Sequence, residues 1–97
     1  MADYIAKLRD DANGGLAPEI EVDAVTEFEA AALALKRFHQ QGVPFDARTG
    51  LELLQGNVTH SKPVPVKDIM YWLRNKKEGR ALVEKDGLQP LLEYVPE

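Results

Sequence analysis

Apolar residues recur at helical spacing most clearly between about residues 24 and 41. Five apolar positions and one histidine fall on a single stripe at intervals of three or four residues: Val25, Phe28, Ala32, Leu35, Phe38 and His39. Asp23 is one candidate for the N-cap, and Thr26 followed by Glu29 forms a competing capping box one turn later. Gly42 follows the last periodic residue and ends the predicted helix.

The same segment contains the run 30–35, Ala-Ala-Ala-Leu-Ala-Leu, which widens its apolar surface beyond one stripe. Small side chains let a second backbone approach closely, so we expect this helix to be central or to pack on two sides. The alanine face has two interpretations, internal packing or the seam of a homodimer.

Three further segments show helical signals. Residues 3–12 place Ile5, Leu8 and Ala12 on one face and end at Asn13-Gly14-Gly15. Thr49 and Glu52 have the spacing of a capping box, which predicts a short helix over residues 48–55.

Pro65 suits the first position of a helix, and we expect that helix to reach about residue 77. Its apolar face consists of four residues, Val66, Ile69, Met70 and Leu73.

The remaining segments are predicted to be extended. Residues 16–22 contain Pro18 and then alternate apolar with acidic side chains, which fits an edge strand or an extended linker. Residues 58–64 are expected to be extended or a loop. Residues 80–95 are interpreted as a β-hairpin that turns at Asp86-Gly87, although Pro90 also fits the start of a short helix.

These elements predict a mainly α fold of the α+β class, with three to four helices and a small C-terminal β-hairpin. The order from residue 24 onward resembles that of a winged helix, with the Pro65 helix in the recognition position and residues 80–95 as the wing, although residues 56–64 make a longer connection than the turn of a standard helix-turn-helix. We divide the chain into an N-terminal helix and arm, residues 1–22, and a globular domain, residues 23–97.

Composition restricts the class of protein. The chain has 97 residues, enough for one hydrophobic core, and no cysteine, which excludes disulfides and thiolate metal sites. The lack of disulfides in so small a domain favours a cytoplasmic location. Residues 1–10 have no uncharged apolar run, so no signal peptide is expected, and no apolar stretch approaches the ~20 residues that span a membrane.

Residues that could support catalysis do not form a recognisable constellation. His39 is explained by packing at the end of its helix, and His60 beside Ser61 lacks a third group to orient it. Neighbouring acids such as Asp10 and Asp11 point in different directions on a helix and do not converge on a metal. We therefore expect a protein that is not an enzyme and has neither a cofactor nor a metal.

Charge is uneven along the chain, whose net charge is −4. Residues 60–80 hold six basic and two acidic side chains, and Lys67, Tyr71 and Arg74 gather on one flank of the Pro65 helix, away from its apolar face. The predicted binding surface consists of these three residues and three further cations: Lys67, Tyr71, Arg74, Lys77, Arg80 and Lys85. Trp72 is expected at the rim of the core.

Two functional hypotheses follow. The first is a small interaction domain, an adaptor, assembly factor or inhibitor, that binds a protein partner. The second is a winged-helix-like regulator that binds DNA through the basic segment, with Lys85 near the tip of the wing. The acidic net charge and the lack of catalytic groups favour the first hypothesis.

Overall fold

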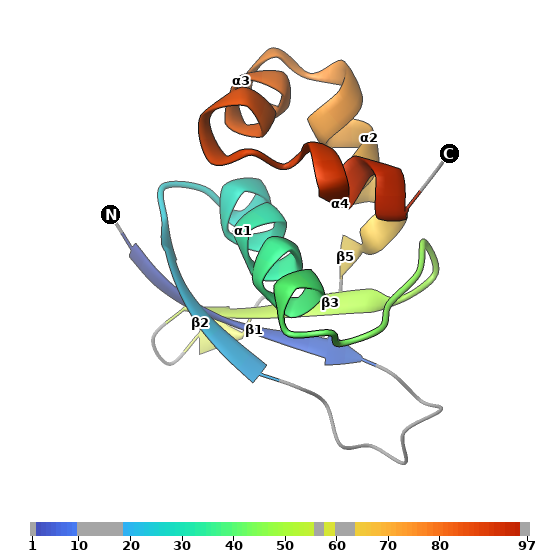
Figure 1. Cartoon of the computed structure of the whole chain (residues 1–97). Coiled ribbons are helices and arrows are strands. Elements are labelled where there is room, and N and C mark those ends of the chain that lie inside the picture. The colour runs from blue at the N-terminus through green and yellow to red at the C-terminus, as the bar shows by residue number, and fades with distance from the viewer. Residues whose placement is uncertain (1, 10–18, 56–57, 60–63, 96–97) are drawn as a thin grey trace.

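The structure, a computed structural model, describes residues 2–9, 19–55, 58–59 and 64–95. Five strands and four helices follow one another in the order β1, β2, α1, β3, β4, β5, α2, α3 and α4 within these residues. Figure 1 shows the sheet as one layer, α1 lying across it, and α2, α3 and α4 gathered beyond α1. The strands therefore come first and most helices last, which overturns the predicted mainly α fold with a C-terminal hairpin.

The sheet is antiparallel, with β1 (Ala2–Arg9) in its interior. β1 pairs on one side with β2 (Glu19–Ala24) and on the other with β3 (Gly50–Gln55). β4 (Val58–Thr59) and β5 (Val64–Pro65) both pair with β3, at different points along it. The described strand order is β2-β1-β3-β4, so β2 is an edge strand.

Alternate residues of the long strands are buried, as expected for a sheet covered on one face. The buried positions are Tyr4, Ala6, Leu8, Ile20, Val22, Ala24, Leu51 and Leu53. Ala6 lies opposite Ile20 on one neighbouring strand and opposite Leu53 on the other. The core therefore begins at this face of the sheet, and acidic residues such as Glu21 point to the opposite face.

The predicted helix over residues 3–12 is wrong where the structure describes it, because residues 2–9 form β1. Ile5 and Leu8 have helical spacing, but Tyr4, Ala6 and Leu8 alternate equally well. Pairing with strands on both sides overrides the weak preference of a short segment for a helix. Residues 10–12 lie outside the described part of the chain.

The predicted helix over residues 48–55 is also wrong, because residues 50–55 form β3 and residues 48 and 49 precede it in a turn. The Thr49 hydroxyl does not cap a helix but accepts a hydrogen bond from the Asp46 amide at 3.0 Å, within a tight turn. The edge-strand interpretation of residues 16–22 is confirmed for residues 19–22, which belong to β2.

The long central helix is confirmed as α1 (Glu27–Gln40). Thr26 is its N-cap and accepts a hydrogen bond from the Glu29 amide at 3.2 Å, so the second of the two predicted caps is the correct one. α1 packs against the three long strands and also against α2 and α4. Four alanines of its face are buried inside the chain, namely Ala30, Ala31, Ala32 and Ala34, which favours internal packing over a homodimer seam.

The predicted helix over residues 65–77 is confirmed for residues 66–75 as α2 (Val66–Asn75), with Pro65 as its N-cap, and its four predicted apolar residues are all buried. α3 (Lys77–Asp86) follows after a single extended residue, Lys76. The two helices meet closely at Gly79. A Cβ atom built there would lie 2.7 Å from the Trp72 carbonyl carbon and 2.8 Å from the Leu73 Cα, so only glycine fits without a shift.

The predicted hairpin over residues 80–95 is wrong, because this segment completes α3 and forms α4 (Gln89–Tyr94). Gly87 has a positive φ of 63° and caps the end of α3, a conformation that a hairpin turn would also have required. The short helix at Pro90 was the correct alternative. With a helix in place of the wing, the winged-helix prediction is wrong as well.

The hydrophobic core extends from the sheet through α1 to the three C-terminal helices. Leu35 and Phe38 are buried on α1, and Leu88, Leu91 and Val95 close the core from the C-terminal segment. Among the helices described, none has both the length and the apolarity needed to cross a membrane.

Candidate functional site

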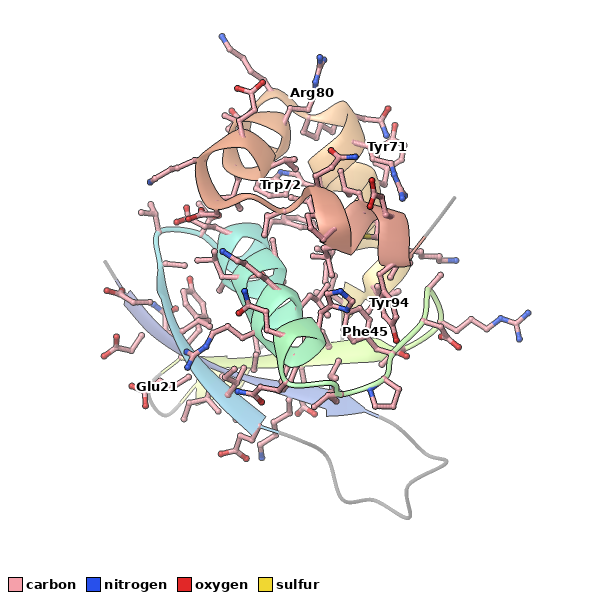
Figure 2. The ribbon with its side chains drawn as sticks, in the orientation of Figure 1. Glu21, Phe45, Tyr71, Trp72, Arg80 and Tyr94 are labelled. Carbon is pink, nitrogen blue, oxygen red and sulfur yellow. The ribbon has the colours of Figure 1, made fainter. Side chains whose placement is uncertain are left out.

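The residues of the predicted basic surface are distributed over α2 and α3. Tyr71 is 60% exposed on α2, where Lys67 is also exposed. Lys77 and Arg80 line a shallow hollow at the start of α3 together with Glu84, whereas Lys85 lines a different hollow. Figure 2 shows Tyr71 and Arg80 on the outer side of the helical layer, away from Trp72.

Arg74 has a structural role in this arrangement. Its Nη2 atom donates hydrogen bonds to the carbonyl oxygens of Leu92, at 2.9 Å, and Val95, at 2.6 Å. The guanidinium therefore satisfies two carbonyls in the last turn of α4 and ties that short helix to α2. An arginine engaged in this way presents less of its charge to a phosphate.

We expect Arg74→Ala to lower the free energy of unfolding by about 2 kcal/mol, because hydrogen bonds to charged groups each contribute about 1.5–3 kcal/mol and water replaces them only in part. Urea denaturation followed by circular dichroism measures this change. Arg80→Ala is the matched control, since Arg80 is exposed, and should cost less than about 0.5 kcal/mol. Equal effects of the two substitutions would contradict a structural role for Arg74.

The histidine that the structure describes packs as the sequence suggested. The His39 ring lies 4.5 Å from the Tyr94 ring, centroid to centroid, and Tyr94 meets Phe45 edge-on at 5.1 Å. Figure 2 shows Tyr94 and Phe45 side by side. This aromatic cluster joins α4 to the end of α1. His60 and Ser61 lie outside the described residues. No group of three or more His, Cys, Asp or Glu side chains in the described ranges is arranged to hold a metal ion.

The most distinctive surface feature is an apolar groove between the start of α1 and the α2–α3 corner. Phe28 and Trp72 form its centre, with their rings stacked at 5.4 Å between centroids and 17° between planes. Val25 is 65% exposed and Phe28 39% exposed, whereas Trp72 is half-buried. The groove encloses about 610 Å³ and is lined by Val25, Thr26, Phe28, Glu29, Trp72, Glu78, Ala81, Leu82 and Lys85.

Local structure explains why these side chains remain exposed. The Thr26 cap starts α1 one residue after Val25, so Val25 precedes the helix and does not continue its buried stripe. Phe28 lies in the first turn of α1, and its ring stacks on that of Trp72 on α2. We refer to this feature as the aromatic groove.

Sequence reasoning missed most of this groove. It assigned Val25 and Phe28 to the buried stripe, and it placed only Trp72 at the rim of the core. The useful signal was present in the capping box, because choosing Thr26 over Asp23 as the cap removes Val25 from the helix. The contact between Phe28 and Trp72 joins distant segments and has no local signature.

Comparison of the chain with models of protein families, with curated proteins and with solved structures gives no match.

Proposed function

We propose that this chain is a non-enzymatic interaction domain that binds a short segment of a protein partner in the aromatic groove. The observation that supports the proposal is the pair of exposed apolar side chains, Val25 and Phe28, beside the half-buried Trp72. Large apolar side chains that stay exposed around an aromatic ring are typical of protein-binding sites.

The size of the groove favours a small anchor over a second copy of the chain. A stable interface buries about 800 Å² on each partner, whereas a single aromatic side chain buries about 150–250 Å². Only parts of Val25, Phe28 and Trp72 are exposed, so the groove offers a fraction of the area that a stable dimer needs. One large apolar side chain from a partner segment fits this area better.

The charged residues at the groove indicate which side chains of the ligand lie next to the apolar anchor. Two carboxylates, Glu29 and Glu78, and one ammonium group, Lys85, line it. This balance favours a cationic residue next to the apolar anchor, because complementary charge raises the rate and specificity of association. The proposed ligand is therefore a peptide segment with a large apolar side chain flanked by lysine or arginine. The absence of cysteine supports a cytoplasmic setting for this interaction.

A peptide titration tests the proposal. Acetyl-Lys-Phe-Leu-Lys-amide is added to the protein while the fluorescence of Trp72, the only tryptophan, is recorded. We expect a saturable change in emission, and we expect Phe28→Ala to weaken binding at least tenfold, since a buried aromatic anchor contributes more than about 1.4 kcal/mol.

Tyr71→Ala provides the matched control, because Tyr71 is an exposed aromatic on α2 that does not line the groove. It should leave the affinity for the peptide unchanged. A peptide that fails to alter the emission of Trp72, or one that Phe28→Ala and Tyr71→Ala weaken equally, would exclude the aromatic groove as the binding site.

A further inference from the structure

Among the described residues, no strand pairs with the outer side of the edge strand β2. Within the described strands β2 pairs only with β1. The Glu21 carbonyl oxygen accepts a hydrogen bond from Nη1 of Arg37 on α1, at 2.8 Å, so this carbonyl points away from β1. In an antiparallel strand the N–H and C=O of one residue point to the same side, and alternate residues share that side. Glu19 and Asp23 therefore face outward with Glu21.

A groove of about 710 Å³ runs between this edge and α1. It is lined by Asp3, Glu21, Val22, Asp23, Leu33, Lys36, Arg37 and Gln40. Leu33 is half-buried, so it offers apolar surface, whereas the strand side offers backbone groups such as the Glu21 carbonyl. Lys36 is engaged elsewhere, because its Nζ donates to the Asp86 carbonyl at 2.7 Å. None of these lining residues belongs to the aromatic groove.

The charges along β2 determine which strand can join it. Glu19, Glu21 and Asp23 are exposed and point to the face of the sheet opposite α1, where Lys7 balances Glu19 at 3.5 Å. Antiparallel pairing of β2 with a second copy in the register centred on Glu21 would place Glu21 against Glu21 and Glu19 against Asp23. Like charges directly opposite each other destabilise a strand pair. The acidic side chains of β2 therefore disfavour pairing with the β2 of a second copy and favour pairing with a basic strand.

We propose that the β2 edge binds an extended segment of a protein partner in which basic and apolar residues alternate. The backbone of the segment pairs with Glu19, Glu21 and Asp23, its basic side chains lie beside these acids, and its apolar side chains face α1 near Leu33. Arg37 moves off the Glu21 carbonyl as the segment binds. This site goes beyond the proposed function, because it is a second surface that is independent of Phe28 and Trp72.

The test uses a fluorescein-labelled peptide, (Lys-Val)₃-Lys, and fluorescence anisotropy in a low-salt buffer. We expect saturable binding that Glu21→Lys weakens roughly fivefold or more, as expected for reversal of an exposed charge pair. Glu84→Lys makes the same change of charge on α3, away from β2, and should have a smaller effect. Arg37→Ala should tighten binding severalfold, because it frees the Glu21 carbonyl and removes a like charge.

Two further peptides separate backbone pairing from simple charge attraction. One carries N-methyl groups on its valines and the other on its lysines, and a strand that pairs along one edge needs only one of these two sets of N–H groups. We expect one version to lose binding and the other to keep it. Equal binding by both versions, or equal losses from Glu21→Lys and Glu84→Lys, would overturn the proposal. Phe28→Ala should not change any of these results, so failure of the aromatic groove and failure of this site are distinguishable.

Discussion

Gly79→Ala is expected to lower the free energy of unfolding by about 2–3 kcal/mol, as overpacking of a close contact does. The added methyl group would be forced against the backbone of Trp72 and Leu73, and a backbone cannot rotate aside as a side chain can. Helix propensity alone predicts the opposite, a gain of about 1 kcal/mol when alanine replaces glycine inside a helix. Urea denaturation followed by circular dichroism decides between the two signs.

Ala81→Gly serves as the matched control for this experiment. Ala81 is exposed on the same helix, so its replacement should cost only the difference in propensity, about 1 kcal/mol. A Gly79→Ala protein that is more stable than the wild type would show that α2 and α3 do not approach as closely as described.

Ala6→Asp is expected to prevent folding under native conditions. Ala6 is fully buried in β1 between Ile20 and Leu53, and a carboxylate there has no described cation to pair with. Burial of an unpaired charge costs several kcal/mol, which is comparable to the total stability of about 5–15 kcal/mol of a small domain. Loss of chemical-shift dispersion in the proton NMR spectrum, without a cooperative thermal transition, is the expected result.

Lys7→Ala tests the neighbouring position on the opposite face. It removes an ion pair with Glu19 between partly exposed side chains, which is worth less than about 1 kcal/mol. The comparison of Ala6→Asp with Lys7→Ala also tests whether residues 2–9 form a strand or a helix. If they formed a helix with Ile5 and Leu8 on its apolar face, Ala6 would lie on the flank of that helix. A folded Ala6→Asp protein would therefore restore the helical interpretation.

The two helices that the sequence predicts correctly each begin at a strong local signal. α1 has the Thr26 cap and Gly42 beyond its last residue, and α2 has Pro65 before its first turn. In both helices the apolar face also packs on the core. Local preference and tertiary packing therefore agree in these segments.

The strands β1 and β3 were mistaken for helices because short apolar segments satisfy both periodicities. Leu51 and Leu53 alternate, yet the adjacent Leu54 and the Thr49–Glu52 spacing imitate a helix start. What decides the conformation is the pairing of β1 with β3, a contact between segments far apart in the sequence. No pattern within ten residues of either strand contains that information.

The error at residues 80–95 has a different physical cause. Gly87 adopts a left-handed conformation that ends a helix as readily as it turns a hairpin. The spacing of Leu88, Leu91 and Val95, three and four residues apart, was the better guide, since all three are buried. The aromatic groove could not be predicted for the reason given for β1 and β3. Its walls come from segments that are far apart in the sequence, and no local pattern shows that they are neighbours.

The position of β1 has a consequence for the cooperativity of folding. β1 and β2 are close in sequence, whereas the pairing of β1 with β3 closes a long loop that contains the whole of α1. The entropy lost on closing a loop rises only slowly with its length, but it must be recovered by contacts that form at the same time. The connection between β1 and β3 contains α1, and α1 covers the sheet that these strands form. Completion of the sheet and burial of the core are therefore a single event. A half-formed sheet would have neither its third long strand nor its cover.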